Sequence, residues 1–297
     1  MKSLSRQLWL TAYCQGQSAG AALTDFLNFA YPDNPLVKGF YMDSGSSFLS
    51  IGTGPDTTHS NFSFVASQLG CDGLNASAKL TCMRDVPVDK IVNFISRYNA
   101  TPPISFAPVP DEKLVFSNYT QRYEIGALAR LPAIYSTCSN EGSGFIPLPA
   151  PGSSVNQTAV NLGTIPLFLC PAEVASEARR KLNLTAYRSQ FAGNFSNVSP
   201  LPWMGAFHSS DLYFYFGTHQ DFRSTSPPFE FAVSQSMQDH LYAFLLDPLE
   251  GPRKIGWPTY SSGKMLRFGA DGKVVQNVTL QEVEGVCTGN GTYDPFP

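Results

Sequence analysis

A serine between two glycines is the first candidate for chemistry in this chain. Gly16-Gln17-Ser18-Ala19-Gly20 is a GxSxG pentapeptide, a pattern that places a nucleophilic serine on a tight turn between a strand and a helix. Both glycines are expected to be necessary, because side chains there would collide with the neighbouring strand and helix. A helix starting at Ala19 would point its N-terminus at the site, so the Ala19 N–H could donate to a developing oxyanion.

A nucleophilic serine also needs a base that takes its proton and a carboxylate that orients the base. Glu141 and His208 follow Ser18 in the order nucleophile, acid, histidine, which is one of the orders known for serine hydrolases. The pentapeptide alone also occurs by chance, so the prediction of Ser18 as nucleophile depends on these two partners. The other three histidines fit structural or solvated positions, two in polar loops and one inside an amphipathic helix: His59, His219 and His240.

Short apolar runs alternate with helical patterns, which predicts a mainly parallel sheet of an α/β protein. We expect strands at 38–42, 131–137 and 184–191, and a hairpin over 265–275. Polar segments follow the first three strands and include the stretches around Glu141 and His208. Open α/β sheets place their sites at these carboxyl ends of strands.

The composition indicates a globular chain with a sizeable core. The chain has 297 residues, of which 43% are hydrophobic and 14% charged, and its formal net charge is −3. Such a balance argues against a nucleic-acid partner. The sequence has no evident apolar run of about 20 residues, so we expect no membrane span. We expect a single domain over residues 1–297, with no internal repeat.

Asparagines indicate the compartment. Ten of the fifteen asparagines lie in N-x-S/T sequons, which favours passage through a secretory pathway and a secreted protein. A generally Ser/Thr-rich surface is the alternative. No convincing signal peptide is visible, so we expect the natural N-terminus to be missing or replaced.

Six cysteines agree with an oxidising compartment. Cys71 and Cys82 bracket a short loop after a predicted helix, and we expect them to be bonded. Cys170 and Cys287 could form a second bridge, but the sequence does not fix that pairing. No cysteine or histidine spacing indicates zinc. Two cysteines are expected to be buried thiols: Cys14 and Cys138.

Several motifs, which follow one another along the chain in the family's own order, resemble one known family. Besides 16–20, they are 39–46 (GFYMDSGS), the Cys71–Cys82 loop, 106–109 (FAPV), 140–142 (NEG), 205–212 (GAFHSSDL) and 257–260 (WPTY). Together they resemble the type-B carboxylesterase/lipase family, the cholinesterase-like serine esterases, and within it the secreted fungal esterases and lipases. The resemblance extends from Gly16 to about Gln281.

This resemblance implies an α/β-hydrolase fold and a carboxylesterase or lipase activity that passes through an acyl-enzyme. It implies Ser18 as nucleophile, His208 as base and then acid, and Glu141 as the orienting carboxylate. Ser44 resembles the serine that hydrogen-bonds around the acid, and Ala19 supplies one oxyanion donor. The implied substrate is a small-molecule or lipid ester, with no cofactor and no metal.

The chain also departs from the family pattern. Gln17 stands where Glu is frequent, Asp43 where Gln is commoner, and Tyr13-Cys14-Gln15 replaces an apolar strand end. The family's oxyanion loop and the strands before the nucleophile strand are expected upstream of Gly16. We therefore expect an incomplete fold with the nucleophile strand at an edge, impaired activity, a missing N-terminal half of the same fold and an atypical N-terminus over residues 1–13.

Two other functions remain open from the sequence. One is a non-catalytic, esterase-like binding or adhesion module, against which the presence of all three triad residues argues. The other is a serine peptidase on the same fold, which the motif wording disfavours.

Overall fold

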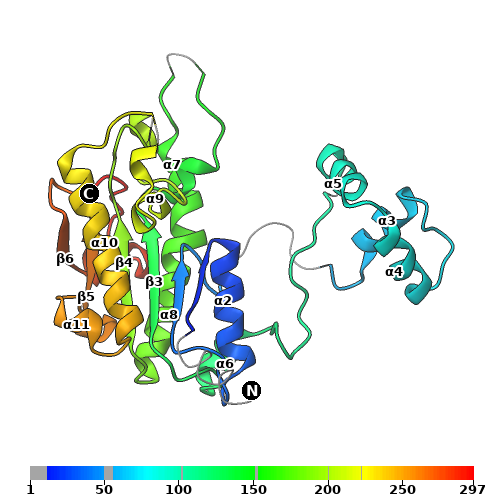
Figure 1. Ribbon diagram of the computed structural model, residues 1–297, viewed down its shortest axis with the longest axis horizontal. Helices are drawn as coiled ribbons and strands as arrows, with labels where there is room; N and C mark the ends of the chain where they lie inside the picture. The colour runs from blue at the N-terminus through cyan, green and yellow to red at the C-terminus, as the bar shows by residue number, and fades with distance from the viewer. Residues whose placement is uncertain (1–11, 50–55, 102, 151–152, 200, 222) are drawn as a thin grey trace, which may run out of the picture. The chain divides into compact units, whose positions relative to one another are not determined.

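In the computed structural model, a six-stranded sheet runs through the larger of two compact units (Figure 1). The strand order follows the chain, and strands β1 to β5 are parallel whereas β6 runs antiparallel to β5. This confirms the predicted mainly parallel sheet of an α/β protein. The strands are β1 (Cys14–Gln17), β2 (Phe40–Asp43), β3 (Ala133–Cys138), β4 (Ala186–Phe191), β5 (Lys264–Phe268) and β6 (Val275–Thr279).

The structure describes residues 12–49, 56–101, 103–150, 153–199, 201–221 and 223–297. The larger unit comprises Met1–Leu49 with Asn118–Pro297, and the smaller one comprises Ser50–Ser117. The single domain over 1–297 therefore stays a prediction. Of the N-terminal segment 1–13, residues 1–11 lie outside the described residues.

Alternate side chains of the central strands face opposite sides of the sheet. Tyr41, Ile134 and Tyr187 join one core together with side chains of α9 and α10. On the other side, the Tyr135 hydroxyl donates to Asp25 of α2. The helices of the larger unit are α2 (Ala19–Ala30), α6 (Tyr119–Glu124), α7 (Gln157–Thr164), α8 (Cys170–Lys181), α9 (Leu212–Tyr215), α10 (Pro228–Leu246), α11 (Gly251–Lys254) and α12 (Leu280–Glu284).

Short helical turns connect these elements and bring the site loops into place. Most are single 3-10 turns, and one is a π-helix that joins α7 to α8. They are η1 (Glu141–Gly144), the π-helix η2 (Ile165–Leu169), η3 (Pro202–Met204), η4 (His219–Asp221), η5 (Tyr260–Ser262) and η6 (Gly285–Thr288).

The smaller unit is a cluster of three helices, α3 (Ser60–Gln68), α4 (Ala76–Asp85) and α5 (Val88–Arg97). Its core includes Val65, Cys71 and Met83. The Cys71–Cys82 disulfide crosses this core, as the sequence predicts. This unit is held together by a small apolar cluster and one covalent link.

A second disulfide joins Cys170 at the start of α8 to Cys287 in η6. The sequence left this pairing open. Cys138 is a buried free thiol as predicted, but the prediction for Cys14 is wrong, because that side chain is only partly buried in β1.

Within the described residues, β1 forms one edge of the sheet, because its only strand partner there is β2. This agrees with the expected edge position of the nucleophile strand. The strand is short, and its Gln15 is exposed.

One helical stretch, Gln157–Lys181, is long and apolar enough to cross a membrane by length and composition alone. The sequence showed no such run, because α7, η2 and α8 become continuous only in the structure. Ala172 and Ala175 of α8 are fully buried, and α8 packs against β3 and β4. Helices in a protein core commonly pass the same test, so the stretch is weak support for a membrane span.

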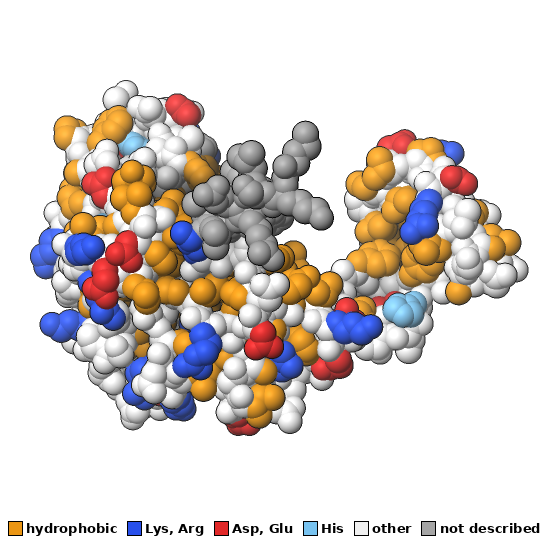
Figure 2. All heavy atoms as spheres, turned by 60° about the horizontal axis from the view of Figure 1, so that its bottom comes forward, with side chains coloured by type: hydrophobic (Ala, Val, Ile, Leu, Met, Phe, Trp, Pro, Cys, Tyr) orange, Lys and Arg blue, Asp and Glu red, His pale blue; other side chains and the backbone are white. Residues whose placement is uncertain are grey.

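Apolar side chains also gather at the surface. Figure 2 shows a band of them on one face of the larger unit, beside lysine and arginine side chains. Large exposed apolar residues occur in both units, with Val88 73% and Leu246 68% exposed. Contiguous apolar surface commonly marks contact with a ligand, a lipid or another polypeptide.

An ion pair is buried on the α12 side of the sheet. The Nη2 atom of Arg188 lies 2.7 Å from Oε1 of Glu284, and their side chains are 0% and 3% exposed. Tyr260 also donates to Glu284 Oε2 at 3.2 Å. The guanidinium of Arg188 therefore depends on Glu284 for its charge compensation.

Glu284→Ala is expected to lower the free energy of unfolding by about 3 to 5 kcal/mol, because it leaves a buried guanidinium unpaired. Urea unfolding followed by circular dichroism measures this loss. The control is Glu177→Ala, which removes the exposed pair with Arg180 and should leave the unfolding midpoint nearly unchanged. Equal urea midpoints for the two variants would contradict the predicted contribution of the Arg188–Glu284 pair to the free energy of unfolding.

Candidate active site

Ser18 lies on the predicted turn between β1 and α2. Its backbone has φ 58° and ψ −124°, a region that non-glycine residues rarely adopt, and its N–H donates to Asp43 O at 2.8 Å. The turn is thus tied to the end of β2, and α2 starts directly at Ala19. The first N–H groups of a helix have no partner within it, so the Ala19 N–H is available to an oxyanion.

The two flanking glycines differ in their roles. A Cβ on Gly16 would lie 2.1 Å from Gly20 O, so a side chain at Gly16 would collide with the start of α2. This confirms the reason predicted for Gly16. A Cβ on Gly20 meets no atom of the described residues within 4 Å, so the predicted collision there is wrong.

Glu141 and His208 form a close pair although 67 residues separate them. The His208 Nδ1 atom lies 2.6 Å from Glu141 Oε2, and the side chains are 9% and 0% exposed. The other carboxylate oxygen, Oε1, accepts from Ser44 Oγ at 2.6 Å and from Cys138 N at 2.7 Å. Glu141 is therefore fixed on both oxygens, with Ser44 in the contact that the resemblance implies.

The loops that carry this pair brace each other. The Asn140 N–H donates to Ala206 O at 2.9 Å, and its side-chain amide donates to the Trp203 and Met204 carbonyls at 2.9 Å. The His208 N–H in turn reaches Glu141 O at 3.4 Å. These bonds hold the acid loop and the histidine loop in one register.

Gln17 links the nucleophile turn to the imidazole of His208. Its Nε2 atom lies 3.1 Å from His208 Nε2. When Nδ1 carries the proton toward Glu141, Nε2 is an acceptor and the Gln17 amide donates to it. Among the described residues no hydrogen bond joins the Ser18 hydroxyl to His208, so the structure brings the acid and base together and leaves Gln17 at the imidazole nitrogen that faces the nucleophile turn.

Two aromatic rings pack on His208, and sequence reasoning missed both. The ring centroids of Phe168 and Phe145 lie 4.6 Å and 4.9 Å from that of His208. Phe168 belongs to the π-helix η2, which includes Pro166. Single π turns are frequent at functional sites, and a proline inside a helical pattern was the available signal.

The remaining histidines lie outside this site. His59 is exposed and His240 is packed near Trp257 and Phe268, as structural positions; burial lowers the His240 pKa. The prediction of a polar loop for His219 is wrong, because it is 1% exposed and stacks on Phe214.

Asn197, one of the ten sequon asparagines, lies beside His219 in the interior. The Asn197 amide is buried and donates to His219 O, to Ser226 Oγ and to Glu230 Oε1, at 3.0, 3.1 and 2.9 Å. A glycan on this nitrogen is incompatible with those contacts. At most nine of the ten sequons can therefore carry a glycan in this fold.

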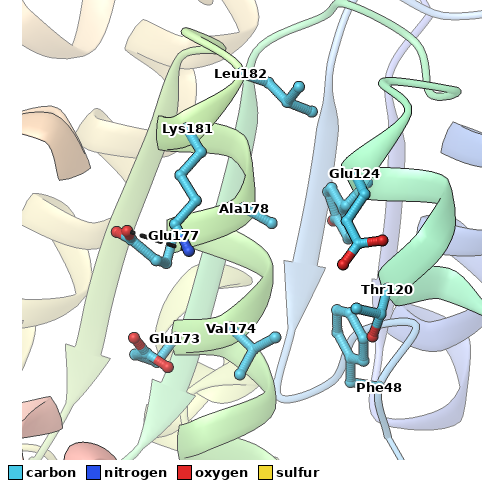
Figure 3. Close-up of a pocket in the computed structure, with 10 residues that line it drawn as sticks. Phe48, Thr120, Glu124, Glu173, Val174, Glu177, Ala178, Lys181 and Leu182 are labelled. Atoms are coloured by element: carbon cyan, nitrogen blue, oxygen red, sulfur yellow. Dashed lines mark ion pairs between the residues drawn. The ribbon is translucent and has the colours of Figure 1, made fainter.

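A cavity of about 560 Å³ in the larger unit does not include the triad. Figure 3 shows that the cavity lies between α8 and α6. Helix α8 contributes Glu173, Glu177 and Lys181, and α6 contributes Thr120 and Glu124. Its polar lining is mainly carboxylate, and the Lys181 ammonium lies 3.9 Å from Glu177. The cavity holds no nucleophile next to a base.

Comparisons with known proteins identify relatives of this chain. The model of the carboxylesterase family matches residues 14–160. Chlorogenic acid esterase of Aspergillus niger is 38% identical over 289 residues, covering 92% of this chain and 56% of that protein. Secreted lipase 5 of Gibberella zeae is 33% identical over 298 residues, covering 93% and 55%. The chain spans about half the length of these curated relatives. Its sheet with surrounding helices is that of an α/β-hydrolase, and the chain belongs to the type-B carboxylesterase family.

Proposed function

We propose that this chain hydrolyses carboxylic esters through Ser18, His208 and Glu141. The observation that carries the proposal is the 2.6 Å contact of His208 Nδ1 with the buried Glu141 carboxylate, at the same end of the sheet as the strained Ser18 turn. Family membership and the names of the relatives, an esterase and a lipase, support the same activity.

In the first half of the reaction, His208 Nε2 removes the Ser18 hydroxyl proton as Oγ attacks the ester carbonyl carbon. The carbonyl oxygen becomes an oxyanion that accepts from the Ala19 N–H. Glu141 stabilises the imidazolium through Nδ1–H. Collapse of the tetrahedral intermediate expels the alcohol, which takes the proton from Nε2, and leaves Ser18 acylated.

In the second half, a water molecule attacks the acyl-enzyme while His208 Nε2 takes its proton, and the acid leaves as Ser18 is reprotonated. The Gln17 amide must move from Nε2 for the imidazole to serve as base, because that nitrogen has a single lone pair. Ala19 is the oxyanion donor that we assign. Loss of one such donor typically costs about 100- to 1000-fold in kcat, so the Ala19 N–H is a substantial part of the proposed catalysis.

The substrate class we propose is a small-molecule or lipid ester. The names of the two relatives, a chlorogenic acid esterase and a secreted lipase, support this class. We also propose an extracellular location, which the two disulfides, the sequons and the name of the secreted lipase support.

A fluorophosphonate probe tests the proposal without a choice of ester. Such a probe phosphonylates an activated serine, so we expect one adduct on the peptide that contains Ser18, found by mass spectrometry. Glu141→Gln should slow the labelling, because it weakens the base. A folded chain that takes up no label would instead support the non-catalytic binding module.

A further inference from the structure

Two further carboxyl groups are buried near the triad acid Glu141. Glu141, Asp43 at the end of β2 and Asp211 before α9 are all 0% or 1% exposed. Ser44 connects two of them, because its Oγ lies 2.6 Å from Glu141 Oε1 and 3.5 Å from Asp43 Oδ1. Asp43 and Asp211 are thus a second layer beneath the acid.

The buried carboxyl groups of Asp43 and Asp211 lie close enough to each other for a side-chain hydrogen bond between them. An ionised carboxylate is an acceptor only, so a bond between two carboxyl groups requires a proton on one of them. The Asp43 Oδ1 atom already accepts from Ser136 Oγ at 2.7 Å. In the described residues, Asp43 Oδ2 and both Asp211 oxygens are buried and accept no hydrogen bond from any other group.

The surroundings offer no positive charge to neutralise the pair. The titratable groups that act on the two carboxyls are acidic groups of β2, β3, η1 and α9: Tyr41, Cys138, Glu141 and Tyr215. His208 lies beyond Glu141 and is bonded to it. The described residues contain no group of three ligands that could hold a metal ion. Two full charges here would be unpaired and buried next to a third, which is strongly unfavourable.

We propose that Asp43 and Asp211 share one proton at neutral pH, so that Glu141 remains the ionised carboxylate opposite His208. The hydrogen resides on Asp43 Oδ2 and Asp211 accepts it. Both are positioning residues, since neither contacts the imidazole. Their effect on the reaction rests on the proposed ester hydrolysis, whereas the shared proton itself does not.

The direction of the pKa shifts agrees with this assignment. Burial, and then the charge of Asp211, raise the pKa of Asp43 well above its usual range. Burial raises the pKa of Asp211 to about 6. Both shifts favour the protonated form of a carboxyl, as a shared proton requires.

The pair makes stability depend on pH. Because the folded-state pKa of Asp43 is raised, its stabilising contribution is full below the unfolded pKa of about 4 and declines as pH rises toward the folded value. Each proton that only the folded state holds raises the unfolding constant about tenfold per pH unit. Asp43→Asn keeps a donor toward Asp211 and removes this proton, so its unfolding constant should rise less with pH between about 5 and 7.

Infrared spectroscopy tests the proton directly, whether or not the chain is active. A protonated carboxyl has a C=O stretch that is absent from a carboxylate and shifts in D₂O. At pH 7 the folded chain should show this band, and ¹³C-labelled aspartate should shift it. Asp43→Asn should abolish it, because it leaves Asp211 as a single ionised aspartate. Asp211→Asn should instead shift the frequency of the band, because the proton on buried Asp43 then faces an amide oxygen. Asp111→Asn is the control, since three backbone N–H groups lower the pKa of the exposed Asp111 to about 2.

Three results would overturn the proposal. They are the absence of a protonated-aspartate band in the wild-type chain, a band that persists in the folded Asp43→Asn variant, and a glutamate band that disappears in Glu141→Gln. The last would put the proton on the triad acid itself. If the aspartate band behaves as expected while the chain hydrolyses no ester, the shared proton stands and the proposed function fails.

Discussion

Ser18→Ala is expected to lower kcat/KM for a short-chain p-nitrophenyl ester by about 10⁴-fold or more, to the rate of the uncatalysed reaction plus weak binding effects. The Ser18 hydroxyl is the group that becomes acylated in the proposed reaction. The fold should be unaffected, because the Ser18 side chain makes no hydrogen bond in the described structure and alanine keeps the N–H that bonds Asp43 O.

The assay compares purified wild-type chain with Ser18→Ala by p-nitrophenol release. Ser67→Ala is the matched control, because that exposed serine of α3 donates only to Phe64 O. Its rate should equal that of the wild type. Equal background rates for wild type and Ser18→Ala would show that this polypeptide is not catalytic, and would remove the proposed function.

Glu141→Gln is expected to lower kcat by about 10⁴-fold while the fold persists, because a triad with an amide in place of the carboxylate holds the wrong histidine tautomer. The structure gives a specific reason. Ser44 Oγ and the Cys138 N–H both donate to Oε1, so the oxygen of a glutamine amide is held there. The amide NH₂ must then face His208 Nδ1, which becomes the acceptor and moves the proton to Nε2.

This prediction is measured by kcat and by the thermal midpoint of the variant. Glu177→Gln on α8 is the control, because Glu177 pairs with the exposed Arg180 away from the triad, and it should retain full activity. Removing Ser44 as well, in Glu141→Gln/Ser44→Ala, weakens the hold on the amide oxygen and should recover part of the rate. A Glu141→Gln variant with more than a tenth of wild-type kcat would contradict the assigned role of Glu141.

The sequence predicted what short patterns encode. The strands at 38–42, 131–137 and 184–191 appear in the structure as β2, β3 and β4, shifted by at most two residues at either end, because apolar runs bounded by turns define strands locally. Glu141 and His208 were found through their order and motifs, and their contact follows from loops at the same end of a parallel sheet.

What the sequence could not predict depends on packing between distant segments. His219 looked solvated because its neighbours in the chain are polar, yet Ser226 and Glu230 satisfy it in the interior. The contact of Gln17 with His208 joins residues 191 positions apart, and no local pattern records it. The Asp43–Asp211 pair likewise joins the end of β2 to the residue before α9, which only the assembled fold brings together.

The Cys170–Cys287 bridge determines what a single proteolytic cut does to this protein. Its ends are 117 positions apart and enclose β4, α9, α10 and the loop that carries His208. A protease that cuts a single bond within this loop leaves two pieces that stay covalently joined until a reductant is added. In an extracellular setting, the piece of a nicked molecule that carries His208 would therefore stay covalently linked to the piece that carries Glu141. Such a molecule would migrate as one chain on a non-reducing gel and as two on a reducing gel.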